Sequence, residues 1–452
     1  MRMPTGPLLG LLLVTACPMV ASAEAPFVKV EPDPAAVCLD GPLAAYTLLV
    51  NGQRADGRVV DLTRGARFAS ADPRVATVSD TGRVAGVADG ATTVTITAAG
   101  RRLTVPVTVT GAARPRHFNF ENDVIPLLSK FGCNSSGCHG KAEGQNGFKL
   151  SVFGFDPAAD YAALTKEARG RRVFPAAPEH SLLLCKASGR VPHGGGVRIR
   201  RESSEYDTLR AWIAAGTPFG EPTDPHVVGV RVEPRERLLA MHGRQQLRVL
   251  ARYSDGREVD VTDHAKFQSN NDSLAMVGGD GLVIAGDVPG DVAVMAAFMN
   301  EVDTFRAVVP RPAVVDPYPA VPENNFIDGP VFRKLRRLNI VPSGLADDAT
   351  FLRRVYLDVI GTLPTAAEAR RFLNDKRPDR RARLVDDLLR RPEFADYWAL
   401  KWADLLRVDR QALGHKDAYH YYRWLRDSLA VNKPLDRMVR ELLTAEGPLT
   451  ES

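Results

Sequence analysis

The chain has 452 residues, of which 44% are hydrophobic and 25% are charged. This length allows three or four domains of ordinary size, and the composition excludes a disordered or fibrous chain. The formal net charge of +5 is small for this length. Charge alone therefore indicates neither a nucleic-acid-binding protein nor a protein of the membrane surface.

The N-terminus has the features of an export signal. Arg2 precedes an almost wholly apolar run at 7–16, and Ala21-Ser22-Ala23 has the small residues that signal peptidase recognises. We therefore predict a signal peptide at 1–23 and an exported protein of the periplasm or cell surface. A lipoprotein signal acylated at Cys17 is the less favoured alternative. No later stretch is apolar over a bilayer's width, so no transmembrane helix is expected in the mature chain.

An internal repeat organises the chain after the signal. Asp56–Thr63 (DGRVVDLT) matches Asp255–Thr262 (DGREVDVT), and positions 56 and 255 differ by 199. Both copies contain short segments of alternating apolar and polar residues, separated by turn signals such as Asp-Gly. This pattern is typical of small antiparallel sandwiches. We predict one sandwich at 27–111 and a second at 227–311.

The two predicted sandwiches resemble bacterial immunoglobulin-like (Ig-like) domains of group 2. The residues that carry the resemblance are the Asp-Gly-Arg turn, the Asp-x-Thr step and the Val-Ala-Thr-Val-Ser strand at 75–79. The resemblance implies a spacer or adhesion module and no catalytic residue. The aspartates of the Asp-x-Thr steps are expected to hydrogen-bond at turns and strand ends, with calcium binding as the less favoured alternative.

The segment between the copies carries a cysteine–histidine motif. Apolar residues at helical spacing predict a helix at 118–131, directly before Cys133, Cys138 and His139, and a second helix follows at 206–216. Two thiols followed by a histidine can attach a haem through thioethers and ligate its iron. We therefore predict one covalent haem c, with His139 as the proximal iron ligand.

Residues 116–222 resemble the cytochrome-c-like domain of large exported planctomycete proteins. Matching segments are Asn122–Leu128, Gly147–Leu150 and Ser181–Leu184, beside the Cys-His motif. The motif departs from the usual C-x-x-C-H, because four residues separate its cysteines. Many relatives have a Met-Pro step that could supply the sixth iron ligand, and here Pro192-His193 stands in its place. His193 is therefore the candidate distal ligand, with His180 as second choice.

Other interpretations of these residues remain open. Cys133 and Cys138 would form an ordinary disulfide in one of them. In another, both cysteines and His139 would bind zinc with one of His180, Cys185 or His193. His193 would be a plain loop residue in a third. Cys185 is expected to be a buried core thiol, and the arginine runs at 169–172 and 198–201 are expected to be solvated surface.

A proline-rich linker at 312–325 precedes a predicted helical domain at 326–452. This domain resembles a planctomycete domain of unknown function, on residues that include Asp347–Asp358, Gly361–Thr365 and Trp402–Arg407. The chain stops in mid-pattern, so a truncated domain is expected. The candidate polar and aromatic residues, for which helix-locking ion pairs and core packing are the favoured roles, are Arg353, Arg354, Asp358, Asp404, Arg407, Trp398, Trp402 and Trp424.

The predicted fold class is a multidomain chain with two all-β sandwiches, a mainly-α cytochrome-c-like domain and a mainly-α C-terminal domain. The favoured function is an exported haem c protein that transfers electrons with an unidentified redox partner. One alternative is a non-catalytic surface adhesion protein with a Cys133–Cys138 disulfide. Another is an enzyme that acts on polysaccharide through the helical domain. The sequence does not decide whether the protein is an enzyme, and nucleic acid is not an expected partner.

Overall fold

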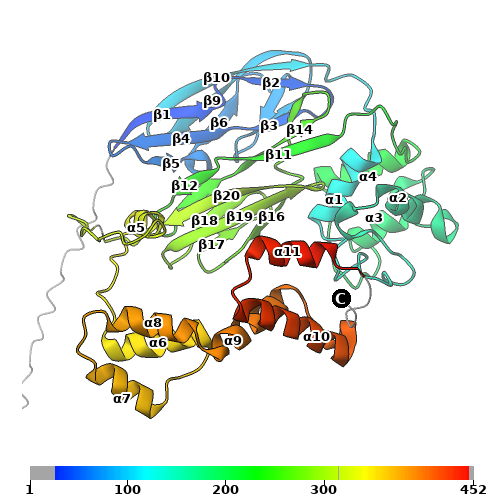
Figure 1. Ribbon diagram of the computed structural model, residues 1–452. Helices are drawn as coiled ribbons and strands as arrows, with labels where there is room; N and C mark the ends of the chain where they lie inside the picture. The colour runs from blue at the N-terminus through cyan, green and yellow to red at the C-terminus, as the bar shows by residue number, and fades with distance from the viewer. Residues whose placement is uncertain (1–25, 314, 447–452) are drawn as a thin grey trace, which may run out of the picture. The chain divides into compact units, whose positions relative to one another are not determined.

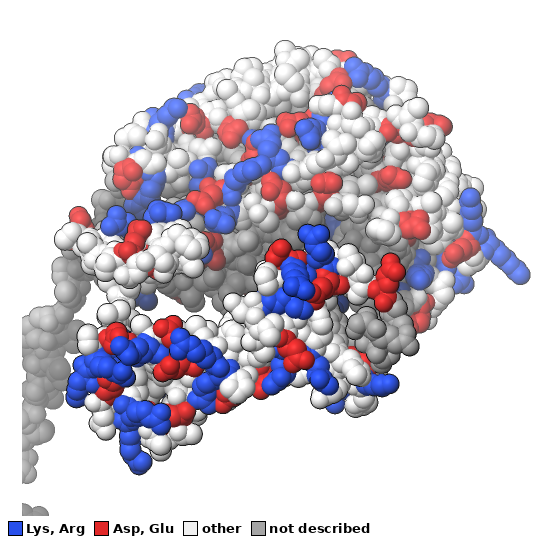
Figure 2. Space-filling model, viewed as in Figure 1, with Lys and Arg blue, Asp and Glu red and all other residues white. Residues whose placement is uncertain are grey.

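The computed structural model describes residues 26–313 and 315–446, so the predicted signal peptide lies outside the described residues. The chain divides into two compact units, with the boundary between Val341 and Pro342. The first unit contains both sandwiches and the central domain, and the second contains helices α6 to α11, which lie within residues 348–444 (Figure 1). Basic and acidic side chains are interspersed over the visible face (Figure 2), in keeping with the small net charge.

The first sandwich forms three sheets, with strand orders β1-β4-β5, β2-β10-β9-β6 and β3-β8-β7. In β10, Val105, Val107 and Val109 are buried and alternate with exposed residues, which is the period of a half-buried strand. Gly100, with φ +73°, lies in the tight turn that joins β9 to β10. The strands are β1 (Phe27–Asp33), β2 (Val37–Asp40), β3 (Ala45–Thr47), β4 (Leu49–Arg54), β5 (Val59–Asp61), β6 (Arg67–Ser70), β7 (Ala76–Val78), β8 (Arg83–Gly86), β9 (Gly90–Ala98) and β10 (Arg101–Thr110).

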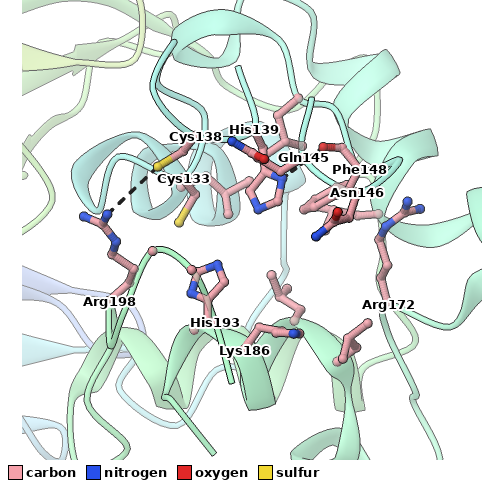
Figure 3. A pocket seen from close by; sticks show the side chains of 18 of the residues that line it. Cys133, Cys138, His139, Gln145, Asn146, Phe148, Arg172, Lys186, His193 and Arg198 are labelled. Atoms are coloured by element: carbon pink, nitrogen blue, oxygen red, sulfur yellow. Dashed lines mark hydrogen bonds between the residues drawn. The ribbon is translucent and has the colours of Figure 1, made fainter. Parts of the chain in front are cut away.

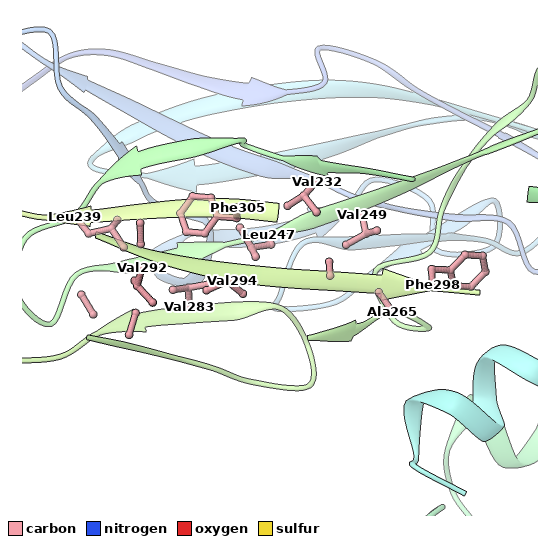
Figure 4. Close-up of a cluster of buried hydrophobic side chains, with 14 of the residues drawn as sticks. Val232, Leu239, Leu247, Val249, Ala265, Val283, Val292, Val294, Phe298 and Phe305 are labelled. Carbon is pink, nitrogen blue, oxygen red and sulfur yellow. The ribbon is translucent and has the colours of Figure 1, made fainter. Parts of the chain in front are cut away.

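The second sandwich repeats this topology, with orders β11-β14-β15, β12-β20-β19-β16 and β13-β18-β17. Its buried core centres on Phe305, Val294 and Leu247 (Figure 4). The matching strand orders agree with the sequence repeat. The strands are β11 (Val227–Glu233), β12 (Glu236–Leu238), β13 (Arg244–Gln246), β14 (Arg248–Tyr253), β15 (Glu258–Asp260), β16 (Lys266–Ser269), β17 (Ala275–Val277), β18 (Leu282–Ala285), β19 (Gly290–Phe298) and β20 (Glu301–Val309).

The two sandwiches contact each other through equivalent residues. The backbone N–H of Gln246 donates to Asp61 Oδ2 at 2.6 Å, and that of Thr47 donates to Asp260 Oδ2 at 2.5 Å. Residues 47 and 246 differ by 199, as do 61 and 260, so each copy gives the other the same bond. Such reciprocity is the mark of a local two-fold interface. The sandwiches are therefore a closed pair, an arrangement that the sequence does not indicate.

The Asp-x-Thr steps orient the carboxylates of this interface. Asp61 Oδ1 accepts from the backbone N–H and hydroxyl of Thr63, and Asp260 Oδ1 accepts the same two bonds from Thr262. The other oxygen of each aspartate is thereby left to face the opposite copy. The expected turn hydrogen bonding is present, and the cross-copy bond is an addition to it.

The central domain (residues 116–222) has short helices joined by long irregular segments. The predicted helix at 118–131 is a π-helical turn (η2, Phe120–Val124) followed by α1 (Ile125–Lys130), with Pro126 in the first turn of α1. The predicted second helix is α4 (Ser204–Ala214), and its N-cap Ser203 accepts from the backbone of Tyr206. The other elements are α2 (Pro157–Thr165), α3 (Leu182–Ala187), η3 (Val152–Gly154), η4 (Glu167–Gly170) and η5 (Pro178–His180).

The central domain has its own apolar core, and it docks on the second sandwich. Phe120 and Trp212 are fully buried in this core. Lys130 forms an ion pair with Glu205 at 3.1 Å and also donates to the carbonyl of Asp263 in the second sandwich. Met299, in the turn between β19 and β20, packs against the cores of both domains. The central domain is therefore fixed to the second copy.

The helix that follows the linker belongs to the first unit. Lys334 of α5 (Asp328–Arg337) forms an ion pair with Asp291 of β19 at 3.0 Å, and the backbone of Arg311 donates to the carbonyl of Leu338. The first helix of the predicted C-terminal domain therefore packs on the second sandwich. The compact helical unit starts at Pro342, after the predicted boundary at 325/326.

The second unit contains two small helical cores. One includes Leu352 and Phe372, and the other includes Ala399, Leu425 and Met438. A capping box is present at the start of α7, where Thr365 and Glu368 bond reciprocally. The helices are α6 (Asp348–Ile360), α7 (Ala366–Asn374), α8 (Arg380–Leu389), α9 (Pro392–Leu405), α10 (Arg410–Ala430) and α11 (Leu435–Thr444).

Candidate functional site

The Cys-His motif forms a compact loop after α1. The backbone N–H of Cys133 donates to the carbonyl of Leu128 at 2.8 Å, and that of His139 donates to the carbonyl of Cys133 at 3.0 Å. A Cβ atom at Gly140 would lie 2.2 Å from the carbonyl oxygen of Asn134, so the loop closes only with glycine there. The four residues between the cysteines are thus accommodated in a tight backbone turn.

His139 is oriented by the segment that follows the loop. Its Nδ1 lies 2.9 Å from the carbonyl oxygen of Phe148, and its ring packs on the Phe148 ring with centres 4.4 Å apart. A bond from Nδ1–H to a carbonyl leaves Nε2 as the free ligating nitrogen. Burial lowers the pKa of His139, which favours the neutral imidazole that binds metals.

His193 faces His139 from a glycine-rich loop after α3. Its Nδ1 lies 2.9 Å from the carbonyl oxygen of Gly196, so its Nε2 is also free of the backbone. The ring centres of His139 and His193 are 6.3 Å apart and their planes differ by 7°. Two imidazoles on opposite sides of one metal ion, each with a nitrogen about 2 Å from it, would have ring centres about 6 Å apart. The spacing therefore suits one metal ion between the two rings.

The two histidines lie at opposite walls of a cavity of about 550 Å³, a size typical of cofactor sites. Figure 3 shows Cys133 and Cys138 on one side of the histidine pair, with Arg172 and Asn146 on the other. The apolar lining includes Leu150 and Leu164. The cations of the lining are Arg171, Arg172, Lys186 and Arg198, and this lining contains no carboxylate.

The four described cysteines, at 38, 133, 138 and 185, are free thiols, so the structure does not contain the alternative Cys133–Cys138 disulfide. Burial raises the pKa of the Cys133 thiol to about 11. Arg198 Nη2 lies 3.9 Å from Cys138 Sγ (Figure 3). Cys185 is buried, as expected for a core thiol.

The zinc alternative lacks its ligand set. The described part of the chain holds no group of three or more His, Cys, Asp and Glu side chains that could bind a metal ion. His180, the second choice for a distal ligand, is exposed and does not line the cavity, and Cys185 does not line it either. Cys133, Cys138, His139 and His193 line one cavity, but no three of them are grouped closely enough to hold one metal ion together.

Both arginine runs were predicted to be solvated surface. This prediction was wrong for Arg172. Arg172 has a side chain only 6% exposed, and it donates to the carbonyls of Ala163 and Gly147. Its guanidinium lies over the Phe148 ring, 4.6 Å from the ring centre. Nothing in the run Arg-Gly-Arg-Arg distinguishes this arginine from its exposed neighbour Arg171.

The candidate residues of the second unit do not form a site. The predicted ion pairs that lock helices are not present among its charged candidates, and all of these candidates are exposed. They are Arg353, Arg354, Asp358, Asp404 and Arg407. Trp398 donates to the carbonyl of Val359 at 3.2 Å and Trp424 to Glu441 at 3.3 Å, while Trp402 packs against the second helical core. These contacts are those of packed tryptophans, as the sequence favours.

Two family profiles match parts of the chain. Residues 44–109 match the bacterial Ig-like domain (group 2), within the first sandwich. Residues 326–451 match PSCyt2, a protein family of unknown function (DUF1549). No curated protein matches the chain. The chain thus contains a bacterial Ig-like domain and a domain of unknown function.

Solved structures resemble the chain only distantly. Domains 5–6 of the S-layer protein SbsC have 13% identity and a TM-score of 0.26, over 64% of this chain and 99% of that one. The Yersinia pseudotuberculosis adhesin InvE has 9% identity and a TM-score of 0.14, over 63% and 58% of the two chains. These scores are too low to support an inference of function. Within the described ranges, no helix has the length and apolar character needed to span a bilayer.

Proposed function

We propose that the protein is an exported cell-surface protein in which a pair of Ig-like sandwiches supports a central domain that binds one haem c. The match of residues 44–109 to bacterial Ig-like domains supports the structural role. This match supports the surface-protein interpretation more directly than the electron-transfer interpretation. The reciprocal bonds between the sandwiches supply the rigid support.

The structural role has a direct test in cells that express the whole protein. An antibody against the second sandwich is expected to label intact cells. Labelling that appears only after the cells are broken would overturn the surface assignment. Binding of the purified protein to isolated cell-surface polysaccharide then tests the candidate partner class.

The single observation that carries the haem proposal is the pairing of His139 with His193 across the cavity. Their ring centres are 6.3 Å apart, and each Nδ1 is engaged by a backbone carbonyl. Cys133 and Cys138 line the same cavity as free thiols, as attachment to two vinyl groups requires. The thiols and imidazoles are groups that bind a haem, and the apolar walls suit its macrocycle.

Each residue has a distinct task in this proposal. Cys133 and Cys138 would hold the macrocycle through thioethers, and His139 and His193 would ligate its iron. The haem would supply a one-electron redox centre, with a lower reduction potential than histidine–methionine ligation gives. The carbonyls of Phe148 and Gly196 keep both ligating nitrogens directed at the cavity.

A pyridine haemochrome spectrum of the denatured protein, made in a host with cytochrome c maturation machinery, tests the proposal. We expect a thioether-linked haem band that is lost in Cys138→Ala and retained in Cys38→Ala, since Cys38 is exposed and outside the cavity. His193→Ala is expected to retain the covalent band and to change the spectrum of the native protein. A wild-type protein without the band would overturn the haem assignment.

A further inference from the structure

Arg172 is a buried cation whose ion pair, with Glu167, is long. Its side chain is 6% exposed, and its two hydrogen bonds go to the neutral carbonyls of Ala163 and Gly147. The carboxylate of Glu167 lies 3.8 Å away on a side chain that is 55% exposed. Buried charges in proteins are normally paired, because an unpaired one loses its hydration without compensation. An arginine has five N–H donors, so donors remain for an anion.

The position of Arg172 in the cavity lining indicates which further anion its remaining donors could bind. Figure 3 shows Arg172 across the cavity from Cys133 and Cys138, beyond the histidine pair. Arg171 is exposed and lines the same cavity. A haem carries its two vinyl groups on one edge and its two propionate carboxylates on the opposite edge. Thioethers at the cysteines would therefore direct the propionates toward the arginine side.

We propose that Arg171 and Arg172 form an anion-binding edge that takes the two haem propionates. The inference rests on the proposed haem site and adds the residues that recognise its carboxylates. Arg172 also acts as a positioning residue for His139: its guanidinium holds the Gly147 carbonyl and covers the ring of Phe148, whose carbonyl accepts from His139.

Redox titration of the purified holoprotein tests the edge, because a paired propionate is a charge close to the iron. In Arg171→Gln the freed carboxylate stabilises the oxidised haem. The ratio of oxidised to reduced haem at fixed potential is expected to rise about tenfold, which equals about 59 mV for a one-electron couple. Arg171 is exposed, so this variant does not disturb the core.

Two further variants separate the charge from the packing. Arg172→Gln is expected to give a shift of the same sign, while Arg172→Lys keeps the charge and stays close to the wild-type potential. Arg198→Gln is the matched control, because Arg198 is exposed, lines the same cavity and lies at the cysteine edge. It is expected to change the ratio less than Arg171→Gln does.

The outcomes distinguish this inference from the proposed function. Covalent haem in every variant, with a shift in Arg171→Gln no larger than in Arg198→Gln, would overturn the propionate edge and leave the haem site standing. A shift in Arg172→Lys as large as that in Arg172→Gln would also overturn it, since charge would then not be the cause. A wild-type protein without haem would overturn both.

Discussion

The two sandwich copies share their strand orders and differ in what they contact. In the first copy, Ala99 is exposed in the turn between β9 and β10. In the second, Met299 occupies the same place between β19 and β20 and packs into the core of the central domain. His264 lies beside the contact of Lys130 with Asp263, and its equivalent in the first copy is Gly65. The strand arrangement is thus the same in both copies. A few loop residues differ, and these determine which copy contacts the central domain.

The largest expected effect is a difference in the stability lost when equivalent core residues of the two copies are truncated. Phe305 is fully buried in β20, and its equivalent in β10 is the fully buried Val105. Phe305→Ala is expected to lower the free energy of unfolding by about 3–5 kcal/mol. Val105→Ala, which removes two methyl carbons, should cost about 2 kcal/mol. Urea unfolding of both variants measures the difference, and equal losses would contradict the comparison.

The reciprocal interface predicts equal effects on the two sides. Asp61→Ala and Asp260→Ala each remove the acceptor of a backbone N–H in the other copy. A buried donor left unsatisfied costs about 1–3 kcal/mol, so both variants should lose this amount in urea unfolding. The exposed turn aspartate Asp56 is the control, and Asp56→Ala should change stability by about 0.5 kcal/mol or less. A loss on only one side would show that the interface is not reciprocal.

The smallest effect is a pH dependence at the contact that only the second copy makes. Burial lowers the pKa of His264, with Lys130 and Arg83 adding to the shift and Asp263 and Glu205 opposing it. A histidine with a lowered folded-state pKa contributes stability that is complete above about pH 6.5 and is lost as the pH falls below this unfolded-state value.

The variant His264→Gln tests this pH dependence. Urea midpoints at pH 7.5 and 5.5 should differ less in His264→Gln than in the wild type. Burial also lowers the pKa of His139, so His139 contributes to the pH dependence as well. That contribution is the same in both proteins and cancels in the comparison. An identical pH dependence in the two proteins would rule out a role for His264.

The sandwiches were predictable because their information is local and repeated. Alternation such as Val105, Val107 and Val109 fixes which face of a strand is buried, and turn residues bound each segment. The sequence also indicates that Asp61 bonds to its own Thr63. It does not indicate the bond to Gln246, because a contact between distant copies leaves no trace in local spacing.

The candidate site was predictable where chemistry requires fixed residue types. The Cys-His motif and the choice of His193 came from sequence, and the structure places these residues around one cavity. One helix was predicted at 118–131, and the structure has a π-helical turn followed by a short α-helix there. The role of Arg172 was missed, because burial of one arginine within a basic run is set by the packing of Phe148 and Ala163 around it.

The reciprocal contact between the sandwiches also determines how their pairing depends on protein concentration. The same interface between two separate chains would open as their concentration fell, since association depends on mass action. Here both faces belong to one polypeptide, and each meets the other at an effective concentration set by the intervening chain. The two sandwiches therefore stay paired however dilute the protein becomes.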